Sequence, residues 1–272
     1  MTTPRLEITV RELILAAAGA CLLAVIMHWP LALHLGQDVP RDLGDPLAQA
    51  WQVAWGGNAL LEQPSRFFQS NQFWPLPDTL AFSDALAGYS PAGMLGSGSE
   101  AAIARYDLLF LFSYALAFLG SYLLARELGV GPMAAAVAGA AYAFAPFRLE
   151  QDGHLHIISS GGIPLALALG VRAVRLRRWR WMLAAWAVAT WQLALGFSLG
   201  IPFAYLLAAL GVVALVVWLS AGRPRIERRL AAAAIVGAVA FLAAGVLSIP
   251  AWNAAASPRL LVSETMWSTP LA

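Results

Sequence analysis

The sequence contains no lysine, a single cysteine and few charged residues. Only 12% of its 272 residues are charged, whereas about a quarter are charged in a typical soluble domain. The single cysteine, Cys21, lies inside the first apolar run, which excludes a disulfide within the chain. Zinc-finger, dinucleotide-binding and phosphate-loop motifs are absent, and there is no basic patch of the kind that binds nucleic acid. We therefore expect no nucleic-acid partner.

Long apolar runs are what the chain does have. Sixty per cent of the residues are hydrophobic and the mean hydropathy is +0.68. A helix that crosses a bilayer needs about 20 apolar residues. We predict an all-α integral membrane protein whose single transmembrane domain, residues 1–272, has seven spans, of which the third to fifth are short and irregular or shielded by their neighbours. The spans are 13–35, 106–125, 133–147, 157–171, 181–196, 201–219 and 230–249.

The arginines predict an orientation. If the N-terminus is cytoplasmic, twelve of the 17 arginines lie inside and five outside, with clusters at 172–180 and 223–229 in short inner loops. The acidic residues follow the opposite bias, with eleven of 15 on the outer side. The first apolar run is too long for a removable signal peptide and lacks a cleavage pattern, so we expect it to remain. These features predict a multi-pass protein of the cell inner (plasma) membrane, with its N-terminus in the cytoplasm.

Residues 36–105 form a long outer loop that is rich in aromatic residues. Asp45 and Pro46 indicate a helix start, with Asp45 capping the free N–H groups and Pro46 in the first helical position. We expect an amphipathic helix over 47–61 that lies on the membrane surface, a second short helix at 79–86, and a helix-capping role for Asp84. Loops of this length are usually functional. The expected apolar stripe consists of Leu47, Ala50, Trp51, Ala54, Trp55 and Leu61.

Three segments of this loop carry a resemblance to a known family. They are 45–55 (DPLAQAWQVAW), 71–75 (NQFWP) and 80–84 (LAFSD), and they follow one N-terminal span and precede paired spans. This order resembles the GT-C superfamily of polytopic membrane glycosyltransferases, in particular its bacterial members. The resemblance extends to about residue 261. The chain is shorter than family members commonly are, which is expected of a fragment or a reduced member.

The resemblance implies a chemistry. Enzymes of this superfamily transfer sugar from a polyprenyl-phosphate donor, and an acidic residue of the first outer loop serves as base or metal ligand. By position that residue is Asp45, although helix capping alone is a sufficient reason for an aspartate there. The frequent pair of adjacent acids is absent, since Asp42 and Asp45 are three residues apart. A divalent metal ion held by Asp45 and Asp152 is a further expectation from the resemblance.

The second outer loop, 148–156, is dense in ionisable groups. Arg148, Asp152, His154 and His156 there are candidates for substrate binding, since carboxylates and imidazoles ligate metals and a guanidinium binds phosphate. Arg259, in the C-terminal outer segment, is a candidate for contact with the donor phosphate. The alternative for the loop residues is a polar turn at the membrane surface, and for Arg259 a solvated loop. Ionisable groups at membrane depth are costly and usually serve a purpose.

The predicted function is transfer of a hexosyl or pentosyl unit from a polyprenyl-phosphate donor, at the outer face of the bilayer, to an acceptor that the sequence does not identify. Two alternatives stay open. A transporter would need ionisable residues in mid-span, and the spans are almost free of them. A non-catalytic or truncated membrane scaffold is favoured by the short chain and the missing acid pair.

Overall fold

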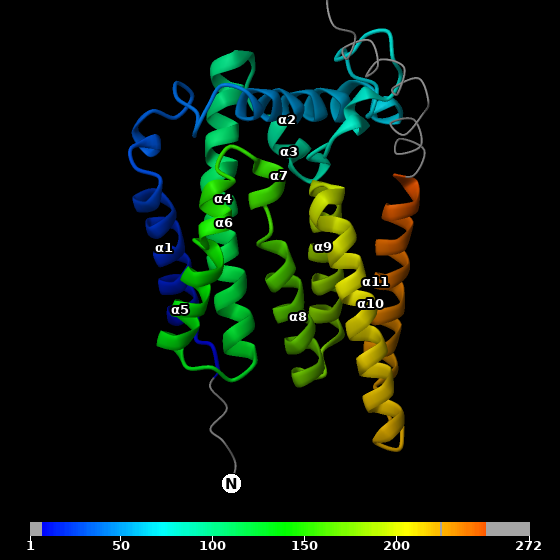
Figure 1. Cartoon of the computed structure of the whole chain (residues 1–272). Helices are drawn as coiled ribbons and strands as arrows, with labels where there is room; N and C mark the ends of the chain where they lie inside the picture. The colour runs from blue at the N-terminus through cyan, green and yellow to red at the C-terminus, as the bar shows by residue number, and fades with distance from the viewer. Residues whose placement is uncertain (1–6, 224, 249–272) are drawn as a thin grey trace, which may run out of the picture.

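The computed structural model describes residues 7–223 and 225–248, and these residues form helices and no strands (Figure 1). Short 3-10 helices at Leu31–Leu33, Pro64–Arg66, Thr79–Phe82 and Ala87–Tyr89 supplement the α-helices. The α-helices are α1 (Val10–Met27), α2 (Asp45–Glu62), α3 (Ser90–Gly93), α4 (Gly98–Glu127), α5 (Pro132–Ala143), α6 (Pro146–Glu150), α7 (Leu155–Ile158), α8 (Gly162–Leu176), α9 (Trp179–Leu195), α10 (Phe197–Ser220) and α11 (Arg228–Leu247).

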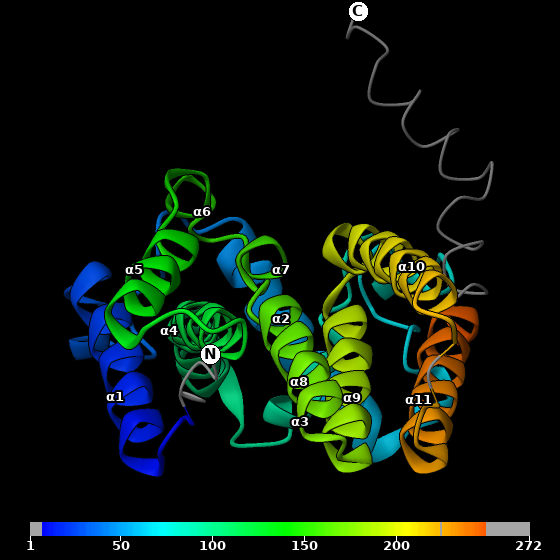
Figure 2. The same cartoon turned by 90° about the horizontal axis from the view of Figure 1, so that it is seen from below.

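The long helices run side by side, and α2 lies across one end of them (Figure 1). Viewed along the bundle, α4 contacts α1, α5 and α8, while α9 contacts α8, α10 and α11 (Figure 2). The chain therefore has two neighbouring helix groups that meet where α8 contacts both α4 and α9.

Within the described residues, five helical segments are long and apolar enough to cross a membrane. They coincide with five of the seven predicted spans, although α1 ends at Met27, before the predicted end at 35. The predicted spans 133–147 and 181–196 fall on α5 and α9, which have 12 and 17 residues. The five segments are Val10–Met27, Gly98–Glu127, Leu155–Leu176, Phe197–Ser220 and Arg228–Leu247.

Large apolar side chains stay exposed along the outer sides of α10 and α11. Val212 and Val216 on α10, and Val236 and Val239 on α11, are all more than half exposed. Water would disfavour so much apolar surface, whereas lipid would cover it. The exposed surface and the length of the apolar helices indicate a membrane protein.

A helix is present over the expected range 47–61, as α2, and the side that it buries in the protein differs from the expected apolar stripe. Gln49, Gln52 and Val53 are buried together with Ala50, whereas Leu47 is exposed. The reason is close approach of two backbones. A Cβ atom on Gly57 would lie 2.2 Å from the backbone carbon of Gly93 in α3, so only the glycine-bearing side of α2 can face α3 at this distance.

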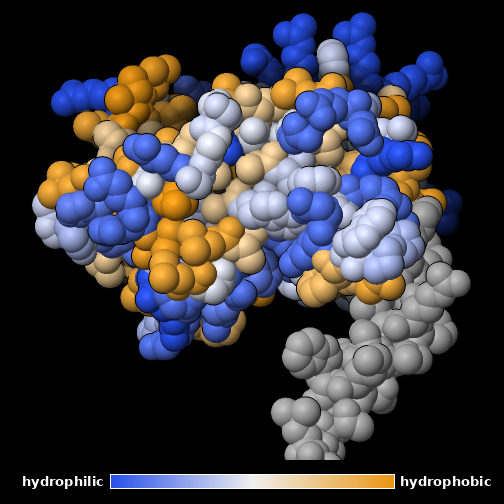
Figure 3. All heavy atoms as spheres, turned by 90° about the horizontal axis from the view of Figure 1, so that it is seen from above, coloured by the Kyte–Doolittle hydropathy of each residue, from blue (hydrophilic) through white to orange (hydrophobic). Residues whose placement is uncertain are grey.

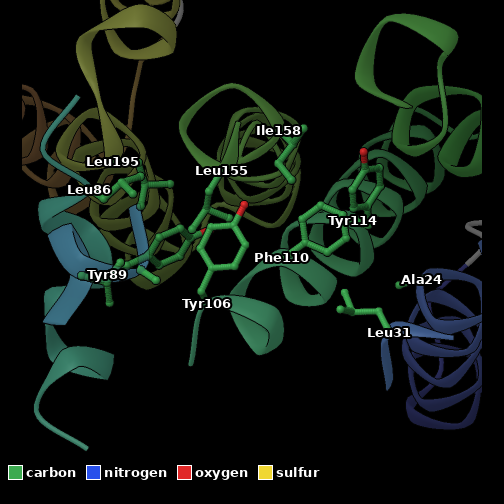
Figure 4. Packing of buried hydrophobic residues seen from close by; sticks show 12 residues of the cluster. Ala24, Leu31, Leu86, Tyr89, Tyr106, Phe110, Tyr114, Leu155, Ile158 and Leu195 are labelled. Carbon is green, nitrogen blue, oxygen red and sulfur yellow. The ribbon is translucent and has the colours of Figure 1, made fainter. Parts of the chain in front are cut away.

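The core beneath α2 is built from aromatic residues of α4. Tyr106, Phe110 and Tyr114 recur at helical spacing and face Leu155 and Ile158 of α7 (Figure 4). All five side chains are fully buried. The aromatic column therefore supports α7 and the loop in front of it, which hold the predicted ionisable residues of the second outer loop.

Ion pairs join the helices at the end of the bundle opposite to α2. Arg126 Nε of α4 lies 2.5 Å from Glu12 Oε1 of α1. The neighbouring Glu127 contacts Arg172 at 2.8 Å and Arg175 at 2.6 Å, both on α8. Thus residues that the arginine asymmetry assigns to the cytoplasmic side share one end, and the predicted outer loops share the other (Figure 1).

Candidate functional site

Asp45 begins α2 but does not cap it, so the capping prediction is wrong. Gly44 is the N-cap residue and no side chain makes the capping hydrogen bond, because Asp45 is already the first helical residue. Its carboxylate instead pairs with His154, with Oδ2 at 2.8 Å from Nε2. The Asp45 side chain is 55% exposed and that of His154 is 33% exposed. The carboxylate is therefore held by one partner and still open to a ligand.

The turn between α6 and α7 brings His154 to Asp45. Gly153 has a φ of +94°, a conformation that glycine adopts without the cost of a side chain. A Cβ atom there would lie 3.3 Å from Pro46, so the turn packs directly on the first residues of α2. Tyr106 also donates a 2.9 Å hydrogen bond to the Gly153 carbonyl. The pairing of His154 with Asp45 therefore rests on a turn that is fixed from two sides.

Gln49 joins the two outer loops, and sequence reasoning missed it. The backbone N–H of Leu155 donates to Gln49 Oε1 at 2.6 Å, and Gln49 Nε2 lies 3.0 Å from His156 Nδ1. The residue is only 5% exposed. A side-chain amide that is buried on the core-facing side of an amphipathic helix indicates that a polar partner lies opposite to it. That partner, the start of α7, is far away in the sequence and could not be named from it.

A cavity of about 810 Å³ opens beside Asp45. Its walls combine carboxylates, amides, an imidazole and aromatic rings, and Phe73 stacks on Phe82 with the ring centres 5.8 Å apart. Seen from the α2 end, hydrophilic and hydrophobic side chains are interspersed over the surface (Figure 3). Convergent polar groups beside apolar faces are the usual composition of a small-molecule site. The lining residues are Asp45, Ala48, Gln49, Gln52, Gln72, Phe73, Trp74, Pro75, Leu76, Phe82, Ser83, Asp84 and His156.

Asp84 lies in the wall of this cavity, where it bonds the start of a distant helix and caps none in its own segment. Its Oδ1 accepts a 3.1 Å hydrogen bond from the backbone N–H of Ser198, in the first turn of α10. The predicted helix at 79–86 is replaced by two 3-10 helices, Thr79–Phe82 and Ala87–Tyr89. The hydrogen bond from Ser198 therefore attaches the cavity wall at Asp84 to α10, which is far away in the sequence.

Asp152 lies apart from Asp45. It lines a second cavity of about 500 Å³, with His28, and His28 Nε2 is 3.6 Å from Asp152 Oδ1. The Tyr114 hydroxyl is within hydrogen-bond reach of the same carboxylate and of the Arg148 carbonyl. Within the part of the chain that the structure describes, no three acidic, histidine or cysteine side chains form a metal-binding group. Asp45 pairs with His154, whereas Asp152 lies beside His28 and Tyr114.

Arg148 is buried beneath the second outer loop. The residue is 5% exposed, and its Nε donates to the Ala143 carbonyl at 2.8 Å while Nη1 contacts the Ser160 hydroxyl. Burial lowers the pKa of the guanidinium from its ordinary value, although arginine stays charged in proteins. This position favours a role in holding the loop between α5 and α8. Arg259 lies outside the described residues.

No protein-family model matches this sequence, and no curated protein or solved structure matches the chain. The functional conclusion therefore depends on the site itself.

Proposed function

We propose that the chain is a multi-pass membrane glycosyltransferase of the GT-C type, which transfers a sugar from a polyprenyl-phosphate donor to an acceptor hydroxyl. The observation that supports it is the Asp45–His154 pair at the wall of a cavity with aromatic and amide surfaces. A carboxylate that is half exposed and held by an imidazole is suited to accept a proton. A cavity at the end of the bundle suits a sugar acceptor that meets a donor whose lipid stays in the bilayer.

In the proposed reaction, the acceptor hydroxyl oxygen bonds to the anomeric carbon while the bond from that carbon to the phosphate oxygen breaks. The electron pair of the broken bond leaves with the phosphate. Asp45 takes the hydroxyl proton. His154 keeps the carboxylate in place through the contact of its Nε2 with Asp45 Oδ2. The departing phosphate needs positive charge, and Arg259 is the proposed source of it.

The proposed topology has seven spans, with α5 and α9 as the short ones beside α4 and α8. Short spans can persist where neighbouring helices shield their ends. The end with Glu12, Arg126, Glu127 and Arg172 is then cytoplasmic, and α2 lies at the outer face of the plasma membrane. The arginine asymmetry supports this orientation.

Transfer of radiolabelled sugar from polyprenyl-phosphate-linked hexoses and pentoses, measured in liposomes, tests the proposal. Asp45→Asn should lower the rate of transfer by about 10²–10⁴-fold, because the amide cannot accept the proton. It should leave folding intact, because the side chain makes no capping bond. Full transfer by Asp45→Asn would exclude Asp45 as the base. Absence of transfer by the unmodified chain with every donor would favour the non-catalytic scaffold.

A further inference from the structure

The two contacts of the Gln49 side chain determine which end of its amide is the oxygen and which is the NH₂ group. The backbone N–H of Leu155 can only donate, so the atom that it meets at 2.6 Å is the amide oxygen of Gln49. The amide NH₂ group therefore faces His156 Nδ1 at 3.0 Å. Because an amide NH₂ can only donate, Nδ1 must accept and has no proton of its own.

It follows that neutral His156 has its proton on Nε2. Each nitrogen of a neutral imidazole has a fixed role, and the hydrogen bond to one sets the role of the other. Nδ1 is occupied by Gln49, and His156 lines the cavity beside Asp45 and Asp84. The imidazole thus offers an N–H donor to a space in which the carboxylates offer acceptors.

The charges in the cavity select among ligands. Among the residues that the structure describes, its lining contains two carboxylates, Asp45 and Asp84, and no arginine. An anionic group placed there would be repelled, and its desolvated charge would have no counter-ion. A hydroxyl group can both accept from His156 and donate to a carboxylate, so uncharged polyhydroxyl compounds fit. The exposed Trp74 ring and the stacked Phe73 and Phe82 rings supply apolar faces for the C–H side of such a ring.

We propose that this cavity binds an uncharged sugar, that His156 Nε2–H donates to one of its hydroxyl oxygens, and that Gln49 is the positioning residue that fixes this direction. The inference rests on the proposed function for the identity of the ligand as a sugar. It goes further by excluding an anionic sugar and the donor phosphate from the cavity. Gln49 itself acts through His156.

The state of His156 can be measured without any transfer reaction. In the full chain labelled with ¹⁵N-histidine in lipid nanodiscs, the ring nitrogen shifts distinguish a protonated nitrogen from a bare one, and His156→Gln identifies the signals. The expected result at neutral pH is a protonated Nε2 and a bare Nδ1. A neutral ring with the proton on Nδ1, or a doubly protonated ring, would overturn the inference whatever the transfer assay shows.

Gln49→Glu tests the cause of this state. The carboxylate still accepts the Leu155 N–H but has no hydrogen to donate, so it attracts a proton to His156 Nδ1, and the bare Nδ1 signal should disappear. Gln63→Glu makes the same change of charge at the exposed end of α2 and should leave the His156 signals unchanged. Circular dichroism confirms that both variants fold. Persistence of the bare Nδ1 signal in folded Gln49→Glu would show that Gln49 does not set the tautomer.

The ligand class is tested with two probes on the same labelled protein. Methyl glucoside, which is uncharged, should shift the His156 Nε2 signal progressively as its concentration rises, and glucuronate should not. An equal response to glucuronate, or no response to methyl glucoside, would overturn the choice of an uncharged sugar. These shifts do not depend on donor or turnover, so failure of the transfer assay alone would reject the proposed function and leave this inference standing.

Discussion

Arg126 of α4 and Glu12 of α1 form an ion pair, with Nε 2.5 Å from Oε1, at the end of the bundle opposite to Asp45. The Arg126 side chain is 2% exposed and that of Glu12 is 18% exposed. Tyr122 adds a 2.7 Å hydrogen bond to the same carboxylate. One buried network therefore joins the first membrane helix to the central one.

Arg126→Met should destabilise the protein strongly. The loss of one partner from a buried pair leaves an uncompensated charge, which costs about 3–5 kcal/mol, whereas Asp38→Asn, in an exposed contact with His34, should cost below about 1 kcal/mol. Thermal unfolding in detergent measures both. The double variant Glu12→Gln, Arg126→Met should regain part of the loss. Equal stability of Arg126→Met and Asp38→Asn would show that the pair contributes little.

Gly57→Ala should displace α2. Its Cβ would lie 2.2 Å from the backbone carbon of Gly93, and overpacking of this kind costs about 1–3 kcal/mol. Gly211→Ala in α10 meets nothing within 4 Å and should be neutral or slightly stabilising. Unfolding midpoints and protease sensitivity of the α2 segment compare the two. A neutral Gly57→Ala would mean that α2 and α3 are further apart in the protein.

The pairing of His154 with Asp45 predicts an order of effects on transfer. General acid–base catalysis contributes about 10²–10⁴-fold, so Asp45→Asn should lower kcat by that range. His154→Ala should lower it less, by about tenfold, because it only holds the carboxylate. Asp152→Asn should have a smaller effect than Asp45→Asn, since Asp152 lines the other cavity. Initial rates with one donor give the comparison, and a larger loss for His154→Ala than for Asp45→Asn would contradict the roles.

Treatment with a chelator distinguishes the two roles proposed for Asp45, a catalytic base and a metal ligand. Asp45 contacts His154, and Asp152 lies near His28 and Tyr114. This arrangement predicts that transfer persists after prolonged treatment with a chelator. The measurement is the initial rate before and after chelation, with Mg²⁺ or Mn²⁺ added back. A loss of transfer that either ion restores would assign Asp45 to a metal site.

Cysteine labelling tests the orientation. Cys21 is the only cysteine in the sequence, so a Cys21→Ser chain is a clean background. Ser97→Cys should react with a membrane-impermeant maleimide from outside the cell, and Arg225→Cys only after permeabilisation. Both positions are exposed. The reverse pattern would place α2 and Asp45 in the cytoplasm and remove the basis for a donor at the outer face.

The membrane helices and α2 could be predicted from the sequence because their signals are local. Apolar runs indicate spans, and Asp45 with Pro46 indicates a helix start. The buried face of α2 could not be predicted in this way. Gln49 and Gln52 look like residues of a solvated face, and only the opposing Leu155, His156 and Ser83 supply the hydrogen bonds that allow their burial.

The site was predictable in part for the same reason. The resemblance to the GT-C superfamily singled out Asp45, and the density of ionisable groups, which are rare in an apolar chain, singled out the second outer loop. Their division between two cavities depends on the turn at Gly153, which directs His154 to Asp45 and leaves Asp152 with His28. That division results from tertiary packing, and residue spacing holds no information about it.

The contact between Gly57 and Gly93 has a consequence for how this protein can diversify. Because the backbones of Gly57 and Gly93 touch, the segment between them begins and ends at the same place on the protein. Within this segment lie Gln72 to Leu76 and Phe82, which line the cavity together with residues of α2. Substitutions in this segment can change the shape of the cavity while α2, which contains Asp45, keeps its position. In the proposed enzyme, a substitution that changes the preferred sugar therefore need not disturb the residue that accepts the proton.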